Sequence, residues 1–267
     1  MTLDHLLAPD ARLEKVASGF TWVEGPAWIS AHSVLRLSDI PGNRVVEFFE
    51  ADGRTAVISD DAEFTNGRTL ASDGSVIECS QGRRAVQIDR SASEPGADYA
   101  PEILVDRLDP ADGSLTTVVI DVEAPNGLAF SPDESVLYVS DSSLAPAEAD
   151  PPTGRPRGHA IHAYDVVEGR HAKNGRELVE VGPGLPDGFR VDAEGNLWSS
   201  SLSGIQVFTP SGEKLGEIPV PEKVANCAFG GADGTTLDIC ASTGINRIRT
   251  RARDAVADRR AGSSGRP

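Results

Sequence analysis

Cysteine is scarce in this chain, with Cys79, Cys227 and Cys240 among 267 residues. The three stand at no spacing typical of a metal site, and an odd number argues against a disulfide framework. Such usage fits a reducing compartment, so we expect a cytoplasmic protein. The start of the chain also lacks a basic segment followed by a long apolar run, and we therefore expect neither a signal peptide nor a membrane span.

Basic residues are also in deficit, with 25 Lys and Arg against 41 Asp and Glu, which gives a formal net charge of −16. This balance argues against binding to nucleic acid or to an anionic membrane surface. It suits cation binding, although solubility alone explains an acidic surface more often. Two familiar hydrolase signatures are missing as well: there is no G-x-S-x-G elbow, and none of the five histidines has a neighbour at zincin spacing.

A repeated hairpin pattern is present instead, and residues 125–141 show it best. Gly127 to Phe130 alternates like a half-buried strand, Ser131 to Glu134 has turn composition, and Val136 to Val139 is β-branched and aromatic. Five copies of this unit each open on a Glu, Asp or Asn, and the openers are 39 to 61 residues apart. Because propeller blades repeat every 40 to 50 residues or so, the pattern predicts an all-β propeller.

The repeat also predicts the domain organisation. We expect a flexible N-terminus at residues 1–11, a single propeller domain at 12–248 and a disordered basic tail at 249–267. The alternating stretch from Arg12 to Ala17 is predicted to complete the last blade. No opener stands between Arg90 and Glu102, and a lone outer hairpin is expected from residues 103–107 and 115–120. One inner hairpin is therefore predicted to be absent.

The openers are the candidate site residues, because innermost strands would bring them to one end of the propeller axis. They are Glu24, Asn66, Asn126, Asp187 and Asn226. Gathered oxygen atoms of this kind suit a hard cation such as calcium. Asn-Gly and Asp-Gly pairs are more often turns than ligands, but these pairs are predicted to precede the inner strand, with the hairpin turn seven residues later.

Two further alternatives concern single openers. Glu24 has an alternative role as an exposed carboxylate at a strand start, yet it lies between Trp22 and Trp28 in an apolar run, where an unpaired charge would be costly. For Asn66 and Asn226, a site role and a structural turn remain equally open.

Four segments carry a resemblance to a known family: 23–28 (VEGPAW), 125–133 (PNGLAFSPD), 185–188 (LPDG) and 226–231 (NCAFGG). They resemble the regucalcin (senescence marker protein), gluconolactonase and luciferin-regenerating enzyme family. The resemblance implies a six-bladed propeller that holds a divalent metal and hydrolyses lactones or related esters. It implies that Glu24, Asn126 and Asp187 are metal ligands, that Asp187 is also the general base, and that Asn66 lines the substrate pocket.

Two departures from the family pattern shape the expectation. The chain lacks a Ser-Pro-Asn-Asp motif before Glu102, and it reads Cys79-Ser80-Gln81 where many relatives read Cys-Glu-His. We therefore expect a propeller of the six-bladed type with one truncated blade and five full inner hairpins. The alternative to a lactonase is a non-catalytic or degenerate metal-binding propeller that has lost a ligand-bearing hairpin, and a phosphotriester hydrolase of similar architecture is a third option.

The predicted reaction is metal-assisted opening of a sugar lactone or related ester by water. The expected cofactor is one divalent cation, calcium first, with magnesium, manganese and zinc as alternatives. The expected partner is a small lactone or ester, with no nucleic acid or membrane, and we expect a monomer or weak dimer.

Overall fold

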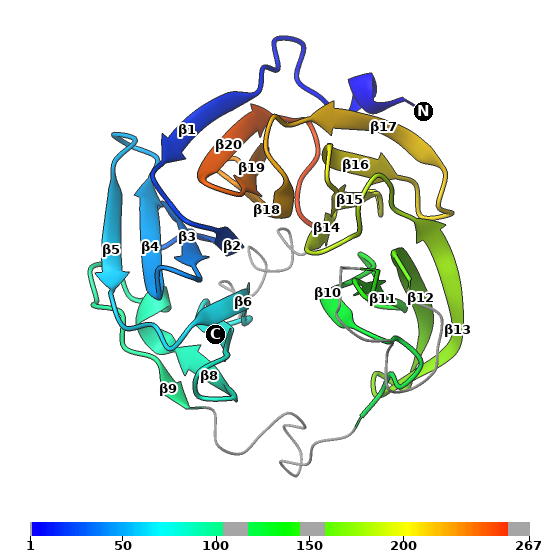
Figure 1. Cartoon of the computed structure of the whole chain (residues 1–267), viewed down its shortest axis with the longest axis horizontal. Helices are drawn as coiled ribbons and strands as arrows, with labels where there is room; N and C mark the ends of the chain where they lie inside the picture. Colours follow the sequence, from blue (N-terminus) through cyan, green and yellow to red (C-terminus); the bar gives the residue numbers. More distant parts are fainter. Residues whose placement is uncertain (1, 104–116, 145–157, 256–267) are drawn as a thin grey trace, which may run out of the picture. The chain divides into compact units, whose positions relative to one another are not determined.

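The computed structural model describes residues 2–103, 117–144 and 158–255. These residues form five four-stranded antiparallel sheets, a β-propeller arrangement of five blades, each drawn as a meander of neighbouring strands in Figure 1. The chain divides into two compact units. Unit 1 comprises residues 1–10, 117–227 and 250–256, and unit 2 comprises residues 11–116, 228–249 and 257–267.

Unit 2 contains two sheets whose strands follow one another along the chain. The first consists of β2 (Val23–Ile29), β3 (Val34–Asp39), β4 (Arg44–Phe49) and β5 (Thr55–Ser59). The second consists of β6 (Thr65–Leu70), β7 (Val76–Ser80), β8 (Ala85–Asp89) and β9 (Glu102–Ile103), with the short 3₁₀ helix η2 (Arg90–Ser93) after β8.

A third sheet has the order β1-β20-β19-β18 and joins the two ends of the chain. Its strands are β1 (Glu14–Ser18), β18 (Val224–Gly230), β19 (Thr236–Ala241) and β20 (Gly244–Arg249). The unit boundary falls within β18, between Cys227 and Ala228. The predicted leading strand is confirmed, because β1 pairs with β20 and completes this last blade.

Unit 1 contains the other two sheets. One consists of β10 (Pro125–Phe130), β11 (Val136–Asp141), β12 (Ala160–Val167) and β13 (His171–Glu180). The other consists of β14 (Phe189–Val191), β15 (Leu197–Ser200), β16 (Gly204–Phe208) and β17 (Lys214–Pro219).

Each unit has its own apolar core between adjacent sheets. In unit 1, Tyr138 and Ile161 of one sheet pack with Phe189 and Leu197 of the next. In unit 2, Trp28 packs with residues of its own sheet and with Cys240 and Ile245 of the last sheet. The alternation that marked the strands in the sequence thus places their apolar faces between blades.

All five predicted inner hairpins are confirmed, since β2-β3, β6-β7, β10-β11, β14-β15 and β18-β19 are neighbouring antiparallel strands. The six-bladed form with a truncated blade is not confirmed. Ile103 pairs with Gln87 as the outer strand of the second sheet, not within a separate hairpin. Residues 117–120 belong to no strand, and the rest of the predicted outer hairpin, 104–116, lies outside the described residues.

The predicted terminal segments contain ordered contacts in their described parts. Leu3 and Leu6 are buried around the 3₁₀ helix η1 (Leu3–His5), and Leu7 forms a β-bridge with Thr250. Asp254 bridges to Asp192, whereas residues 256–267 lie outside the described range. The assignment of 12–248 as a single domain stays a prediction.

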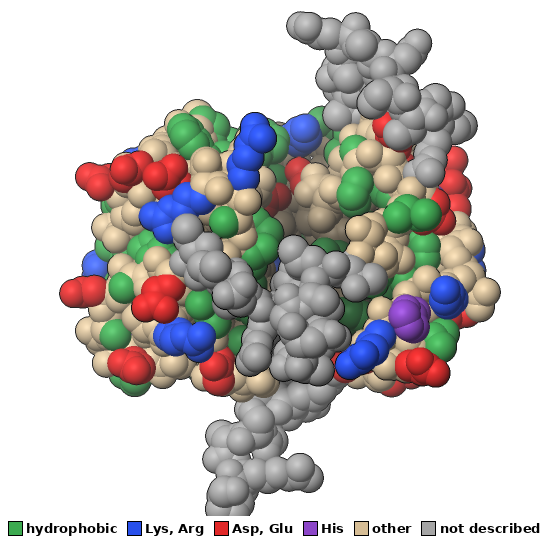
Figure 2. All heavy atoms as spheres, turned by 90° about the horizontal axis from the view of Figure 1, so that it is seen from below, with side chains coloured by type: hydrophobic (Ala, Val, Ile, Leu, Met, Phe, Trp, Pro, Cys, Tyr) green, Lys and Arg blue, Asp and Glu red, His purple; other side chains and the backbone are tan. Residues whose placement is uncertain are grey.

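Charged side chains of both signs are visible on one face of the molecule (Figure 2). On the face shown in Figure 2, acidic and basic side chains alternate and the acidic surplus gathers in no single patch. This distribution fits the solubility explanation of the net charge. In the described part of the chain, no helix combines the length and the apolar character that crossing a membrane requires.

Candidate functional site

The five openers fall into two groups, one in each unit. Asn126, Asp187 and Asn226 belong to unit 1, and Glu24 and Asn66 belong to unit 2. Four of them lie inside their strands. The prediction that the polar-glycine pairs at Asn126 and Asp187 precede the inner strand is confirmed for Asp187, which stands two residues before β14, and is wrong for Asn126, which lies within β10. At Glu24, Asn66 and Asn126 the strand register shifts, as at a β-bulge. A bulge re-aims a side chain and is frequent beside active sites.

The backbone of Asp187 is held by three hydrogen bonds. Its N–H donates to Ser200 Oγ at 2.9 Å, and its carbonyl oxygen accepts from Gly127 N at 3.1 Å and from Ser140 Oγ at 2.8 Å. Both serines are fully buried at the ends of second strands. The position of the half-buried Asp187 is therefore fixed by its own sheet and by the neighbouring one.

Asn126 lies on the exposed side of this group and is linked to the same loop. Its Nδ2 donates to Ser142 Oγ at 3.2 Å, and the Ser142 hydroxyl donates to the Pro186 carbonyl at 2.7 Å. Since the amide nitrogen serves as the donor, the amide oxygen is the atom suited to a cation. The structure thus brings Asn126 and Asp187 together within unit 1.

The glycines that follow Asp187 and Asn126 explain how closely neighbouring openers approach in unit 1. A Cβ on Gly127 would lie 2.4 Å from the Asp187 carbonyl oxygen, and one on Gly188 would lie 2.0 Å from Asn226 Cγ. Neither distance admits a side chain. The glycines of these two polar-glycine pairs are therefore required by packing between adjacent inner strands, in addition to any ligand role of the polar residues.

Glu24 is only 5% exposed in β2, a strand in which all seven residues are buried. Its burial between the tryptophans is confirmed. The carboxylate Oε2 accepts a hydrogen bond from the N–H of Gly25. Gly25 has φ of +56°, and a Cβ there would lie 2.1 Å from the Asn66 carbonyl oxygen. Glu24 and half-buried Asn66 thus stand on adjacent strands of unit 2.

The predicted ligands Glu24, Asn126 and Asp187 offer two carboxylates and one amide. All three are oxygen donors, and this set fits calcium or magnesium better than a thiolate-seeking metal. In the described ranges, no group of three or more His, Cys, Asp or Glu side chains is arranged to hold a metal. Because Glu24 belongs to unit 2 and the other two to unit 1, their assembly around one cation stays a prediction, as does the substrate role of Asn66.

Sequence reasoning missed the serines on the second strands. Ser38, Ser140 and Ser200 are fully buried; Ser140 and Ser200 accept hydrogen bonds from Gly127 N and Asp187 N, and Ser38 accepts one from the Arg68 guanidinium. A signal for them exists, since a serine recurs near the end of the second strand in Leu37-Ser38-Asp39 and Val139-Ser140-Asp141. The hydroxyls of Ser140 and Ser200 hold the opener segments across their hairpins.

Asp141 behaves as a cap for the backbone at the end of β11. Its Oδ1 accepts from Ala124 N at 3.2 Å and from Ser143 N at 2.9 Å. Asp39 accepts in the same way from the N–H groups of Thr21 and Trp22, both at 3.0 Å. These carboxylates tie the loops that enter the inner strands.

The acidic hairpin turns also have the predicted structural role. Asp133 accepts from the hydroxyls of Ser131 and Ser135, and these bonds lower its pKa to about 2. In Asp233, bonds from Thr235 lower the pKa to about 2. Because hydrogen bonds to neighbouring residues account for these carboxylates, they need no chemical role.

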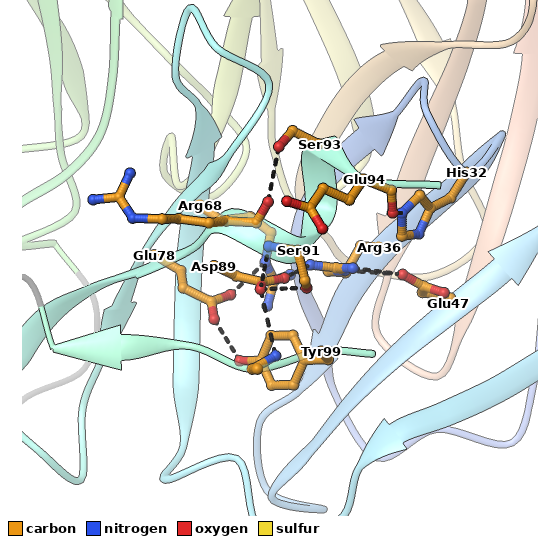
Figure 3. Close-up of polar contacts among 12 residues, drawn as sticks. His32, Arg36, Glu47, Arg68, Glu78, Asp89, Ser91, Ser93, Glu94 and Tyr99 are labelled. Carbon is orange, nitrogen blue, oxygen red and sulfur yellow. Dashed lines mark hydrogen bonds and ion pairs between the residues drawn. The ribbon is translucent and has the colours of Figure 1, made fainter. Parts of the chain in front are cut away.

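Unit 2 also holds a buried polar network that the sequence did not reveal (Figure 3). Arg36 donates to Glu47 at 2.8 Å and to Asp89 at 2.6 Å, and its guanidinium lies 5.3 Å from the centre of the Tyr99 ring. Burial, assisted by the charge of Glu78, raises the pKa of the Tyr99 hydroxyl. A pocket of about 640 Å³ is lined in part by Arg36, Glu47 and Tyr99, and by none of the five openers.

Comparisons with known proteins agree on one family. The SMP-30/gluconolactonase/LRE-like region matches residues 103–243, which is more than half of the chain. The gluconolactonase of Zymomonas mobilis is 30% identical, across 93% of this chain and 84% of that protein. A solved gluconolactonase of Xanthomonas campestris is 32% identical with a TM-score of 0.77, across 93% of this chain and 92% of that one.

A more distant structure shares the fold alone. It is a regucalcin of Agrobacterium tumefaciens, described as a calcium-binding protein, with 16% identity and a TM-score of 0.67 across 90% of this chain and 95% of that one. The family match and the Zymomonas relative together decide the identification. The chain belongs to the SMP-30/gluconolactonase/LRE-like family.

Proposed function

We propose that this protein hydrolyses a sugar lactone or a related carboxylic ester with the help of a bound divalent cation. Family relatives named as gluconolactonases support the reaction class. The observation that carries the proposal for this chain is the fixed backbone of Asp187 beside Asn126, held through Ser140 and Ser200. A carboxylate carried on a backbone fixed in this way, with an amide side chain bonded to the same loop through Ser142, suits both cation binding and proton transfer.

Glu24, Asn126 and Asp187 would hold the cation through their oxygen atoms. When bound, a cation of this kind polarises the lactone carbonyl and lowers the pKa of a nearby water. Asp187 accepts the proton of the attacking water, for which its carboxylate must come within about 3 Å of that proton's oxygen. Asn66 contacts the substrate from β6. Calcium is the first expectation because the donors are oxygens, and a distant relative with this fold is described as calcium-binding.

The direct test is turnover of a sugar lactone such as gluconolactone by wild type and Asp187→Ala in the presence of Ca²⁺. Removal of a general base lowers kcat by about 10²- to 10⁴-fold. Asp165→Ala is the matched control, because this carboxylate is exposed in the same unit and pairs with Arg176 on the surface. Equal rates for wild type and Asp187→Ala would overturn the enzyme proposal.

Metal dependence has its own test. Chelation with EGTA should abolish turnover, and added Ca²⁺, Mg²⁺, Mn²⁺ or Zn²⁺ should restore it to different degrees. Calorimetric titration of the same samples measures cation binding independently of activity. Turnover that persists after complete chelation would exclude the metal, and binding without turnover would support a non-catalytic metal-binding protein.

A further inference from the structure

Arg68 is a buried cation placed against the strand that carries Glu24. It lies in β6, its side chain is fully buried, and three groups accept its hydrogen bonds: the Gly25 carbonyl at 2.5 Å, Ser38 Oγ at 2.7 Å and Glu78 Oε2 at 3.1 Å. Each nitrogen of the guanidinium thus has a separate partner. Such a fork fixes the relative positions of everything it binds.

Glu78, the counter-ion of Arg68, is itself held in place. It is 1% exposed and accepts from Gln87 Nε2 at 2.9 Å and from the Tyr99 hydroxyl. Burying two charges is costly, and apolar residues of similar volume often stabilise a protein as well or better. The Arg68–Glu78 pair is therefore explained better by orientation of the Gly25 carbonyl and the Ser38 hydroxyl than by a gain in stability.

The groups that Arg68 binds belong to the bulge at Glu24. The register of β2 against β3 shifts between Glu24 and Ala27, and Ser38 is the residue opposite Glu24 across the hairpin. Gly25 adopts a left-handed φ of +56° next to the carboxylate. Arg68 therefore bonds both strands of the hairpin at the irregular point from which Glu24 projects.

We propose that Arg68 is a positioning residue that holds the Glu24–Gly25 bulge in the conformation Glu24 needs to bind the cation. This inference rests on the proposed function, because it makes Arg68 responsible for part of the cation affinity of the same proposed site. It predicts that weakening the Arg68 fork lowers cation affinity without removing any ligand. Changes to residues that support metal ligands typically cost about 10- to 100-fold in metal affinity.

The molecule offers a matched control in Arg36. It is equally buried at 1% exposed, and its hydrogen bonds go to Glu47 and Asp89 (Figure 3). Arg68→Lys and Arg36→Lys each keep a positive charge and each lose a buried guanidinium fork. A general effect of lost packing or stability should therefore appear in both variants, whereas an effect on the bulge should appear in Arg68→Lys alone.

The experiment combines calorimetric titration with Ca²⁺ and amide hydrogen exchange of the full chain, at a temperature where circular dichroism shows all three proteins folded. We expect Arg68→Lys to bind Ca²⁺ about 10- to 100-fold more weakly than wild type, and Arg36→Lys to bind within about threefold of it. Exchange in a peptide covering residues 23–28 should accelerate in Arg68→Lys only. Saturating Ca²⁺ should restore the kcat of Arg68→Lys.

The outcomes separate this inference from the proposed function. Wild-type affinity in Arg68→Lys, an equal loss in both variants, or a kcat that no Ca²⁺ concentration restores would overturn the role of Arg68 and leave the proposed function standing. A wild-type protein that binds no divalent cation would overturn both. Selective weakening in Arg68→Lys, with faster exchange at the bulge, supports the proposal.

Discussion

Strand β2 buries all seven of its residues, whereas β10, which carries the same type of bulged polar-glycine motif, leaves Leu128 and Phe130 62% and 42% exposed. In unit 2, β2 has packing partners on both sides, from β6 and from the sheet of β19. In unit 1, β14 approaches β10 at Gly127. The two bulged motifs therefore have different surroundings: β2 is enclosed within unit 2, whereas the described approach to β10 within unit 1 comes from β14.

The glycines that follow the openers also differ in how closely neighbouring atoms surround them. A Cβ on Gly25, Gly127 or Gly188 would collide with the next opener, while one on Gly67 would meet no atom of the described residues within 4 Å. Three of these positions therefore require the absence of a side chain and Gly67 does not, although all four glycines look alike in the sequence.

The largest effect is expected from Gly25→Ala, which should destabilise the protein by about 4 kcal/mol because it combines a left-handed φ with a backbone clash. Gly67→Ala should be neutral or stabilising by about 0.5 kcal/mol, since it only restricts the unfolded chain. Urea denaturation of both variants measures the difference. Similar losses for the two would show that β2 and β6 are equally enclosed.

A second pair compares apolar residues on the two inner strands. Ile29 in β2 is 1% exposed, so Ile29→Thr should cost about 3 kcal/mol through a cavity and a buried hydroxyl. Leu128→Thr in β10 should change stability by less than about 0.5 kcal/mol, because the side chain is already largely in water. Thermal unfolding gives both values. A loss above about 2 kcal/mol for Leu128→Thr would mean that β10 is covered in solution.

A smaller effect, on the pH dependence of stability, is expected from a buried carboxylate beside β2. Asp238 lies in β19 near Trp28 and Gly230, and its Oδ1 accepts from Arg247 Nε at 2.7 Å. Its Oδ2 has no hydrogen-bond donor among the described residues. Burial raises the pKa of Asp238 to about 6 from an ordinary value of 3.8, while the charge of Arg247 acts in the opposite direction.

The sign of the pH effect follows from this raised pKa. Between pH 7 and 5 the folded protein takes up a proton at Asp238 that the unfolded chain does not, so stability should rise on acidification by about 1 kcal/mol. The carboxylates with lowered pKa, such as Asp133 and Asp233, titrate below this window. Urea midpoints at pH 7 and 5 should show the rise in wild type and its loss in Asp238→Asn; parallel pH slopes would contradict the assignment.

Local sequence signals were sufficient to predict the inner hairpins, but they were insufficient to predict which outer strands pair beside those hairpins. Turn residues such as Asp133 and strand alternation identified all five inner hairpins, because both signals operate within about ten residues. They gave no information on which strand Ile103 joins, since its partner Gln87 is chosen by the edge that the second sheet leaves open. Ile103 is therefore not part of the predicted outer hairpin, most of which lies outside the described residues.

The candidate site shows the same limit. The openers Glu24, Asn126 and Asp187 were identifiable because they recur at fixed places in a repeat. Arg68 was not, because its bond to the Gly25 carbonyl spans 43 residues and depends on two sheets packing together. The register shifts at Glu24, Asn66 and Asn126 likewise arise from strand pairing, which the order of residues does not display.

The pairing of β1 with β20 has a consequence for synthesis of the protein. Glu14 lies opposite Arg247 in this sheet, so its first strand leaves the ribosome more than two hundred residues before its partner. During that interval β1 lacks the strand it will pair with, and the blade forms only when translation is nearly finished. Contacts between such distant residues slow folding, so completion of this blade is expected to be a late step.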